Sequence, residues 1–222
     1  MKFFPFAFFY TVALIGCASA DAAEKTLTVP LVEIRSIDPT IVIELRYAGA
    51  NNIAHRPLYP PGMPALIRPE VGPRLAAAQT MLRRLEYSLK IWDAYRPKTA
   101  QIELWRASHN NDFVADPDAG AGSLHAWGIA VDATLVDKLG HPVSMPTDYD
   151  DFTPAAMWRY QGNNEIVRHH LQLLQVAMRE AGFLGLRSEW WHFTVVDWQK
   201  FLPPEKAKRA FEVFYGARRK KL

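Results

Sequence analysis

A single carboxylate inside an apolar run places the strongest constraint on the fold of this 222-residue chain. Asp132 stands within residues 129–135, among Ile, Ala, Val, Thr and Leu. Burying a carboxylate in such a strand is costly unless a metal or another partner compensates for it. His125 is a candidate second ligand, but seven residues of straight strand would span about 23 Å. Because zinc ligands lie only about 2 Å from the metal, the chain must turn between the two residues, and Gly128 is the expected place.

A second constraint comes from the run Glu-Trp-Trp-His that extends from Glu189 to His192. In a regular strand, residues three apart point to opposite faces. If both side chains serve one site, Glu189 must lie in a turn or bulge just before the strand, and residues 185–188 allow such a turn. His125, Asp132 and His192 would supply the three protein ligands that a catalytic zinc takes while leaving a position open for water.

Two further residues turn this metal-binding pattern into a reaction hypothesis. Glu189 is a spare carboxylate that could take a proton from the attacking water. Arg96 could pair with an oxyanion that develops during the reaction. A lone histidine is more often structural or exposed, and we assign five others to that class: His55, His109, His141, His169 and His170.

Composition and charge narrow the class of protein. With 49% hydrophobic and 22% charged residues, the chain is typical of an ordinary globular protein, and its length suits one domain. The formal net charge is +3, and the one basic block, residues 218–221, lies at the very end. No basic face runs through the sequence, so we expect no nucleic-acid partner.

The N-terminus has the pattern of an export signal. Lys2 precedes an apolar stretch over residues 3–16, and Ala18-Ser19-Ala20 matches a cleavage site. The apolar stretch is shorter than the roughly 20 residues that span a bilayer. We therefore expect residues 1–20 to be a signal peptide, residues 21–222 to form the domain, and the protein to be exported to the periplasm. Residues 14–17, Leu-Ile-Gly-Cys, also resemble a lipobox, so a lipid anchor at Cys17, the one cysteine, is the alternative.

The remaining patterns predict a mixed architecture. We expect one or two short strands within residues 26–46, an irregular loop over 47–69, a helix from Pro69 to about residue 87, and a strand over 89–95. A helix over 98–109 and a strand over 129–136 follow. Asn163 or Asn164 should cap a helix that ends near Gly182. A strand over 190–196 and a helix over 204–216 complete the chain. This order predicts a single α+β domain, with a small, mostly antiparallel sheet that carries the zinc site and helices packed around it.

Three motifs resemble one enzyme family. The pattern S-x-H-x-x-G-x-A-x-D is matched from Ser123 to Asp132, E-W-W-H from Glu189, and W-D-x-Y-R-P-x-x-A from Trp92 to Ala100. Together they resemble the zinc D-alanyl-D-alanine dipeptidases. The wider group contains D,D- and L,D-carboxypeptidases of peptidoglycan and shares its metal site with Hedgehog signalling domains. The resemblance extends from about residue 47 to about residue 196.

The resemblance implies a role for each matched residue. His125, Asp132 and His192 would bind one zinc ion per chain, Glu189 would be the catalytic base, and Arg96 would stabilise the tetrahedral intermediate. Four residues would bind or support the substrate. These are Tyr47, Ser123 near the substrate carboxylate, Asp150 at the free ammonium and Asp93 beside Arg96. The neighbouring Asp148 and Asp151 leave the match at Asp150 ambiguous.

The implied activity is zinc-dependent hydrolysis of D-Ala-D-Ala to D-alanine, linked to cell-wall peptide metabolism. Export favours an alternative, a D,D- or L,D-carboxypeptidase that trims peptidoglycan stems, whereas the motif that begins at Trp92 favours the dipeptidase. A third alternative, a zinc-stabilised binding module without activity, conflicts with the presence of both Glu189 and Arg96. The sequence leaves the oligomeric state open.

Overall fold

The computed structural model describes residues 30–108 and 113–208. The predicted signal peptide, the lipobox at Cys17, His109 and the basic block at 218–221 lie outside these residues. Within them, no helix combines the length and the apolar character needed to cross a membrane.

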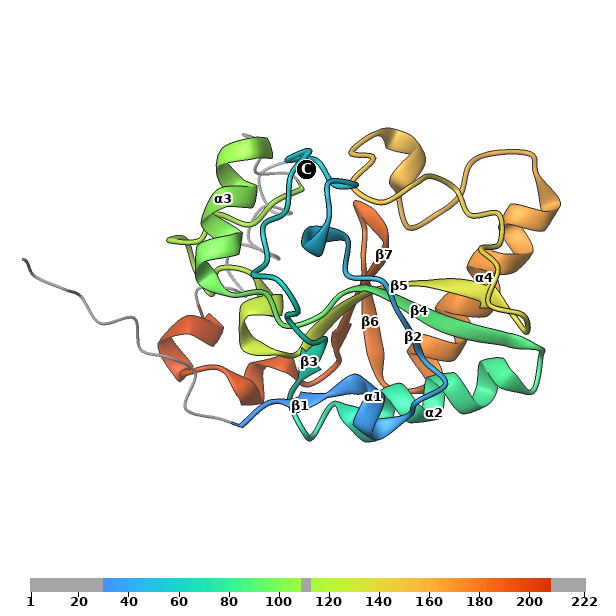
Figure 1. The fold of residues 1–222 in the computed structure, drawn as a ribbon, viewed down its shortest axis with the longest axis horizontal. Helices are drawn as coiled ribbons and strands as arrows, with labels where there is room; N and C mark the ends of the chain where they lie inside the picture. Colours follow the sequence, from blue (N-terminus) through green and yellow to red (C-terminus); the bar gives the residue numbers. More distant parts are fainter. Residues whose placement is uncertain (1–29, 109–112, 209–222) are drawn as a thin grey trace, which may run out of the picture.

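The centre of the fold is a five-stranded sheet with the order β2-β4-β5-β7-β6 (Figure 1). Its strands are β2 (Val42–Ile43), β4 (Tyr87–Asp93), β5 (Ala130–Asp137), β6 (Phe183–Leu186) and β7 (Glu189–Val195). Only β2 runs parallel to its neighbour, and the other three pairings are antiparallel. The predicted α+β fold with a small, mostly antiparallel sheet is confirmed.

A second, two-stranded sheet joins β1 (Val32–Glu33) to β3 (Leu66–Ile67). The short helix α1 (Ile34–Ile37) follows β1 directly, so the predicted strand region 26–46 contains a helical turn between its two strands. The 3-10 helix η1 (Arg46–Ala48) then begins the irregular segment expected over 47–69.

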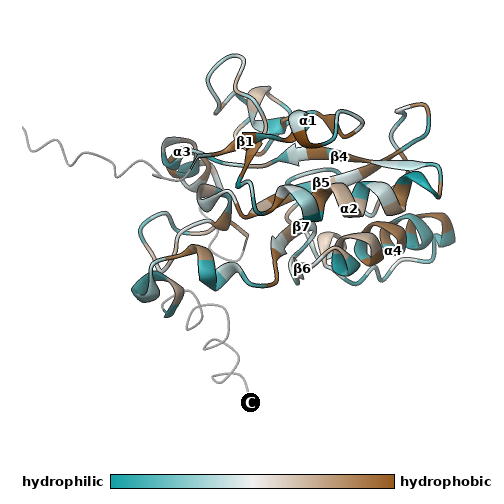
Figure 2. Cartoon of the chain, turned by 90° about the horizontal axis from the view of Figure 1, so that it is seen from below, coloured by the Kyte–Doolittle hydropathy of each residue, from teal (hydrophilic) through white to brown (hydrophobic). Residues whose placement is uncertain are grey.

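Two helices pack on each other and on the large sheet, namely α2 (Gly72–Arg83) and α4 (Glu165–Glu180) (Figure 2). The Asn164 side chain accepts hydrogen bonds from the backbone N–H groups of Ile166 and Val167, which confirms one of the two predicted caps. Gly182, with φ +88°, follows the end of α4 in the left-handed conformation that glycine adopts readily. Leu75 and Leu82 of α2 and Leu174 of α4 are fully buried.

The prediction for α2 was wrong at both ends. Pro69 lies in a turn before the helix, and Pro73 occupies the first turn instead. The helix ends at Arg83 because a turn follows in which Glu86 has φ +66°, and this turn starts β4 at Tyr87, two residues earlier than expected. Helix α3 (Lys98–Ser108) begins where predicted. Strand β6 had not been expected, and of the predicted final helix the structure describes residues 204–208 as helical.

The two faces of the sheet differ in character. On β5, Val131, Ala133 and Leu135 alternate with Asp132 and Thr134, and all five are buried. Successive residues of a strand point to opposite faces. One face is therefore apolar, as packing against α2 and α4 requires, and the other carries the polar side chains from which the candidate site is built.

Candidate active site

A row of three polar residues crosses the centre of the sheet. Asp132 of β5 lies opposite Asp93 of β4 on one side and opposite His192 of β7 on the other. The pairing with Asp93 depends on a bulge: Ile91 pairs with Ala133, but Asp93, two residues on, pairs with the next residue of β5. In a regular ladder Trp92 would face Asp132, so the bulge at Trp92 brings the carboxylate into the row.

An irregularity on the other side of β5 accounts for the placement of Glu189. Gly185 of β6 pairs with Phe193, whereas Leu186 pairs with Glu189. The partners of these two consecutive β6 residues are therefore separated by three residues of β7, numbered 190–192. Glu189 is the first residue of β7 rather than part of the preceding turn, and the predicted interruption of the strand lies just after it. Because of this interruption, Glu189 and His192 need not point to opposite faces of the sheet, as residues three apart in a regular strand would.

His125 reaches the row from the 3-10 helix η2 (Leu124–Trp127). The Ser123 hydroxyl caps this helix by accepting a hydrogen bond from His125 N, 3.3 Å away. Gly128 ends the helix with φ +67°, so the predicted turn lies at the expected residue. A Cβ at Gly128 would lie 3.3 Å from the backbone nitrogen of Arg68 and 2.8 Å from the end of the Leu31 side chain, so this turn has little space for a larger residue and a conformation that favours glycine.

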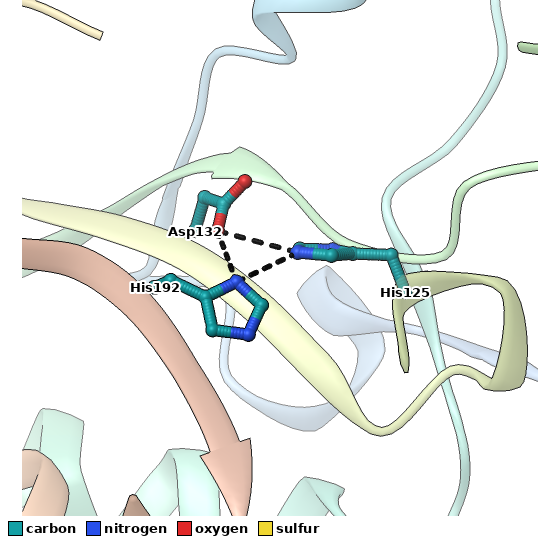
Figure 3. Close-up of side chains that lie close together, drawn as sticks. All are labelled: His125, Asp132 and His192. Carbon is teal, nitrogen blue, oxygen red and sulfur yellow. Dashed lines mark hydrogen bonds and ion pairs between the residues drawn. The ribbon is translucent and has the colours of Figure 1, made fainter. Parts of the chain in front are cut away.

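The three side chains converge on one point (Figure 3). His192 Nδ1 lies 3.0 Å from Asp132 Oδ1, His125 Nε2 lies 3.3 Å from the same oxygen, and the two nitrogens are 3.1 Å apart. Three ligands of a tetrahedral zinc at about 2.0–2.1 Å would lie about 3.3 Å from one another. The triangle therefore has the size that such an ion requires.

The outer nitrogen of each imidazole has a partner that can accept its hydrogen. His125 Nδ1 donates to the backbone carbonyl of Ala94 at 2.9 Å, which leaves Nε2 with its lone pair. His192 Nε2 lies 2.9 Å from Thr194 Oγ1, and donation to that oxygen leaves Nδ1 free. Two lone pairs and a carboxylate oxygen then face one point with no hydrogen between them. Such a set of donors fits a metal cation.

The electrostatics agree with a cation at this point. Burial lowers the pKa of His125, but Asp132 and Asp93 outweigh it and raise that pKa above its usual value. Burial raises the pKa of Asp132, yet His125 and His192 bring it well below its usual range. Burial also lowers the pKa of His192, which favours the neutral ring that a metal binds.

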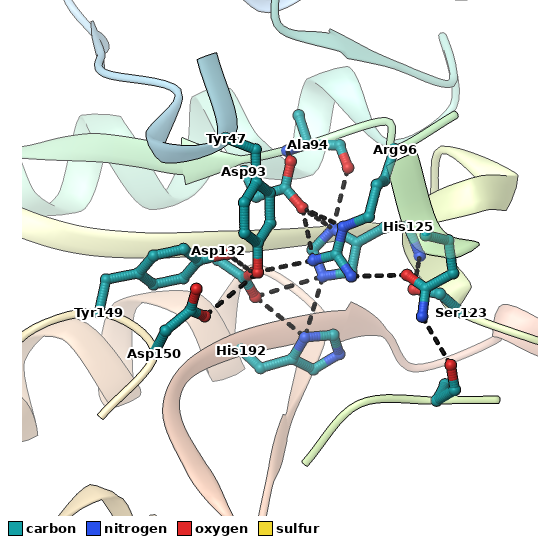
Figure 4. Close-up of polar contacts among 12 residues, drawn as sticks. Tyr47, Asp93, Ala94, Arg96, Ser123, His125, Asp132, Tyr149, Asp150 and His192 are labelled. Atoms are coloured by element: carbon teal, nitrogen blue, oxygen red, sulfur yellow. Dashed lines mark hydrogen bonds and ion pairs between the residues drawn. The ribbon is translucent and has the colours of Figure 1, made fainter. Parts of the chain in front are cut away.

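Arg96 lies beside this triangle and is held from two sides (Figure 4). Its Nε and Nη2 donate to Asp93 Oδ2 at 2.8 and 2.6 Å, and its Nη1 donates to Gln101 Oε1 at 2.7 Å. Gln101, from α3, in turn donates to the Ala115 carbonyl. The guanidinium also stacks over the Tyr47 ring, 4.8 Å from its centroid. Arg96 is only 6% exposed, so these contacts define its position tightly.

The predicted substrate residues lie on the same side. Tyr47 donates to Asp150 Oδ1 at 3.1 Å, and the Ile53 N–H donates to Asp150 Oδ2 at 3.1 Å. Asp148 instead pairs with Arg46 at 3.2 Å and does not share the contact with Tyr47 that Asp150 makes. Asp150 has φ +57°, a left-handed conformation that is uncommon for residues other than glycine but that aspartate adopts more readily than most. Burial raises its pKa to about 7.

Glu189 lies outside the three-residue cluster but within its electrostatic field. Its side chain is buried, and burial together with Asp132 and Asp150 raises its pKa well above the usual range. Arg96 and a hydrogen bond with Trp191 act in the opposite direction. A carboxyl group with a raised pKa holds a proton more readily than an exposed glutamate does, which suits it to proton transfer.

The remaining histidines have the expected placements where they are described. His55, His141 and His169 are exposed, and His170 is buried with its Nδ1 bonded to the Ser144 carbonyl. Among the described residues, the group that could hold a metal is the one formed by His125, Asp132 and His192.

Comparison with known proteins agrees with this geometry. Residues 27–212 match the family model described as D-Ala-D-Ala dipeptidase. The chain belongs to the D-Ala-D-Ala dipeptidase family. It is 33% identical to the D-alanyl-D-alanine dipeptidase of Escherichia coli K12 over 166 residues, which cover 75% of this chain and 84% of that protein. It is 26% identical over 181 residues to the D-alanyl-D-alanine dipeptidase of Synechocystis, covering 60% and 70% of the two chains.

Among solved structures, a match was found to a mutant of the vancomycin-resistance D,D-pentapeptidase VanY in complex with Zn(II). The TM-score is 0.39 and the identity 16%, over 63% of this chain and 78% of that one.

Several residues of this dipeptidase-family site were missed from the sequence. Tyr149 donates to Asp132 Oδ2 at 2.7 Å, Tyr59 donates to Asp93 Oδ1, and Gln101 holds Arg96. Tyr149 is the neighbour of a predicted residue, and Gln101 lies one residue beyond the motif that ends at Ala100, but neither position predicts a contact. Only the fold brings these side chains to the site.

Proposed function

We propose that this chain hydrolyses the dipeptide D-Ala-D-Ala to two molecules of D-alanine, with one zinc ion held by His125, Asp132 and His192. The observation that carries the proposal is the triangle of two imidazole nitrogens and one carboxylate oxygen, 3.0–3.3 Å apart, in which His125 and Asp132 are buried and His192 is partly exposed. Membership of the dipeptidase family supports the choice of substrate.

The chain's own residues have separate tasks in this reaction. When bound, zinc acidifies water and polarises a carbonyl oxygen. Glu189 takes the proton from the attacking water as the C–O bond forms, and returns it to the amine as the C–N bond breaks. Arg96 donates to the carbonyl oxygen as negative charge develops there, and because Asp93 and Gln101 already fix it, little reorganisation is needed at that moment.

The two ends of the dipeptide have matching partners. The Asp150 carboxylate, oriented by Tyr47 and the Ile53 N–H, would bind the free ammonium. The Ser123 hydroxyl accepts from His125 N and still has a hydrogen to donate to the substrate carboxylate. A carboxylate at the ammonium end favours a dipeptide over a peptidoglycan stem, in which that nitrogen is an uncharged amide.

The test combines one variant with three substrates. Glu189→Gln should bind one zinc ion per chain, as the wild type does, and lose about 10²–10⁴-fold in turnover of D-Ala-D-Ala. Glu180→Gln, an exposed glutamate on α4, is the matched control and should be fully active. Wild-type enzyme should cleave D-Ala-D-Ala and spare L-Ala-L-Ala and a pentapeptide stem. Faster cleavage of the stem would identify a carboxypeptidase, and near-wild-type turnover by Glu189→Gln would remove the proposed base.

We also propose that the protein is exported and acts in the periplasm on peptides derived from the cell wall. The support is the sequence of residues 1–20, with a basic start, an apolar stretch and a cleavage-site pattern. Mass measurement of the mature protein from cells would distinguish cleavage after Ala20 from a lipid anchor at Cys17. A mass that includes residues 1–20 would contradict export by either route.

A further inference from the structure

Tyr149 is a buried tyrosine whose hydroxyl contacts the central carboxylate of the site. Its hydroxyl donates to Asp132 Oδ2 at 2.7 Å, and the residue is 6% exposed. Its ring packs against Tyr47, Trp92 and Trp191, with centroid separations of 5.6, 5.3 and 5.6 Å. The hydroxyl is therefore held in place by aromatic contacts from three other segments of the chain.

The two oxygens of Asp132 consequently have different surroundings. Oδ1 lies in the triangle with the two histidine nitrogens, at 3.0 and 3.3 Å. Oδ2 is turned to the other side, where it accepts from Tyr149 and lies 3.6 Å from Arg96 Nη2. Rotation of the carboxylate that brought both oxygens to a metal would break the hydrogen bond with Tyr149.

The residue after Tyr149 belongs to the substrate side of the site. Asp150 has φ +57°, and its carboxylate accepts from Tyr47 and from the Ile53 N–H. Of these two successive loop residues, Tyr149 contacts the carboxylate of the metal site and Asp150 provides the carboxylate proposed to bind the substrate ammonium. A displacement of this loop would disturb both.

We propose that Tyr149 is a positioning residue that holds Asp132 as a one-oxygen metal ligand and ties the metal site to the loop that binds the substrate ammonium. This inference rests on the proposed function for the identity of the metal and the substrate. It assigns to Tyr149 no contact with the reacting atoms. Partners of this kind, which orient a metal ligand, typically change metal affinity by about 10–100-fold when removed.

The test is Tyr149→Phe, which keeps the ring and removes only the hydroxyl. Zinc affinity, measured by competition with a chromogenic chelator, should fall about 10–100-fold. The visible absorption of the cobalt-substituted protein should shift, because a freed carboxylate changes the coordination of the ion. The matched control is Tyr87→Phe, a partly buried tyrosine at the opposite end of β4, about 20 Å of strand from Asp93. It should leave both measurements unchanged.

The melting temperature of the zinc-free proteins separates positioning from a loss of folding. Tyr149→Phe should melt near the wild type without zinc and gain less stability from added zinc. Unchanged zinc affinity and an unchanged cobalt spectrum would overturn the inference even if the wild type cleaves D-Ala-D-Ala. A weakened zinc site in Tyr149→Phe, with no cleavage by the wild type, would support the inference and refute the proposed function instead.

Discussion

The pair formed by Asp93 and Arg96 offers the sharpest test of how the site is held together. Asp93 is fully buried, and its Oδ2 accepts two hydrogen bonds from Arg96, at 2.8 and 2.6 Å. Its Oδ1 accepts from Tyr59 and from the Ala94 N–H. Each of these hydrogen-bond partners of Asp93 is a donor, so this position requires a side chain whose polar atoms only accept hydrogen bonds.

Asp93→Asn keeps the shape of the side chain and removes this property. Whichever way the asparagine amide turns, its NH₂ group faces an N–H donor, either that of Ala94 or those of Arg96. The guanidinium of Arg96, which is only 6% exposed, also loses its charged partner. Removing one partner of a buried ion pair costs about 3–5 kcal/mol. That is a large share of the 5–15 kcal/mol typical of a folded domain. At about 2–4 °C per kcal/mol for a chain of this size, we expect the melting temperature to fall by roughly 10 °C.

The assay is thermal unfolding of the zinc-free protein, followed by tryptophan fluorescence. The control is Glu86→Gln, which breaks the exposed ion pair with Lys138 and should leave the unfolding midpoint unchanged. Turnover of D-Ala-D-Ala by Asp93→Asn should also fall, because Arg96 loses one of its two anchors. A midpoint equal to that of the wild type would show that the buried pair does not stabilise the fold and would refute this reasoning.

Three other perturbations test separate parts of the site. Gln101→Met removes the acceptor for Arg96 Nη1, and a hydrogen bond to a charged group contributes about 1.5–3 kcal/mol. This loss should lower kcat about 10–100-fold and leave KM near the wild-type value. Because the pKa of Asp150 is raised to about 7 and only the carboxylate binds ammonium, kcat/KM should fall by at least about tenfold per pH unit below 7. Asp150→Asn should make this limb of the pH profile less steep, and the fall that remains is the one caused by protonation of Glu189. Gly128 has φ +67° and little space for a Cβ, so Gly128→Ala should lower the free energy of unfolding in urea by at least about 1–2 kcal/mol. The same change should weaken zinc binding by displacing His125. Wild-type values for both quantities would contradict the need for glycine.

The parts of the site that could be predicted were those in which the chemistry of one segment required a particular chain path. A buried carboxylate and a histidine seven residues apart required a turn, and the structure has it at Gly128. The spacing of Glu189 and His192 required an interruption of the strand, and β7 contains one, although it follows Glu189 instead of preceding it. In each case a local conflict with regular geometry was visible in the sequence.

The contacts that could not be predicted join segments far apart in the sequence. Tyr59 and Asp93 are 34 residues apart, and Tyr149 and Asp132 are 17 apart, with loop residues on one side of each contact. Neither tyrosine stands in a periodic pattern that would indicate which way it points. The end of α2 was also missed, since it depends on the left-handed conformation of Glu86, and a glutamate gives no local signal for such a turn.

The two irregularities of the sheet explain why a polar site can form at its centre. Both lie on strands that flank β5, one at Trp92 of β4 and one after Glu189 of β7. On the apolar face, Val131 pairs with Phe193 and Ala133 with Ile91, and Val131 and Ala133 are both fully buried. On the other face, the bulge at Trp92 replaces an indole by the Asp93 carboxylate opposite Asp132, and Arg96 then has a buried partner three residues later. A regular β4 would have left Asp132 facing an aromatic ring and Arg96 without its anion. The fold therefore interrupts strand pairing on the flanking strands, whereas β5, which carries the central ligand, keeps a regular register with β7 over residues 130–132.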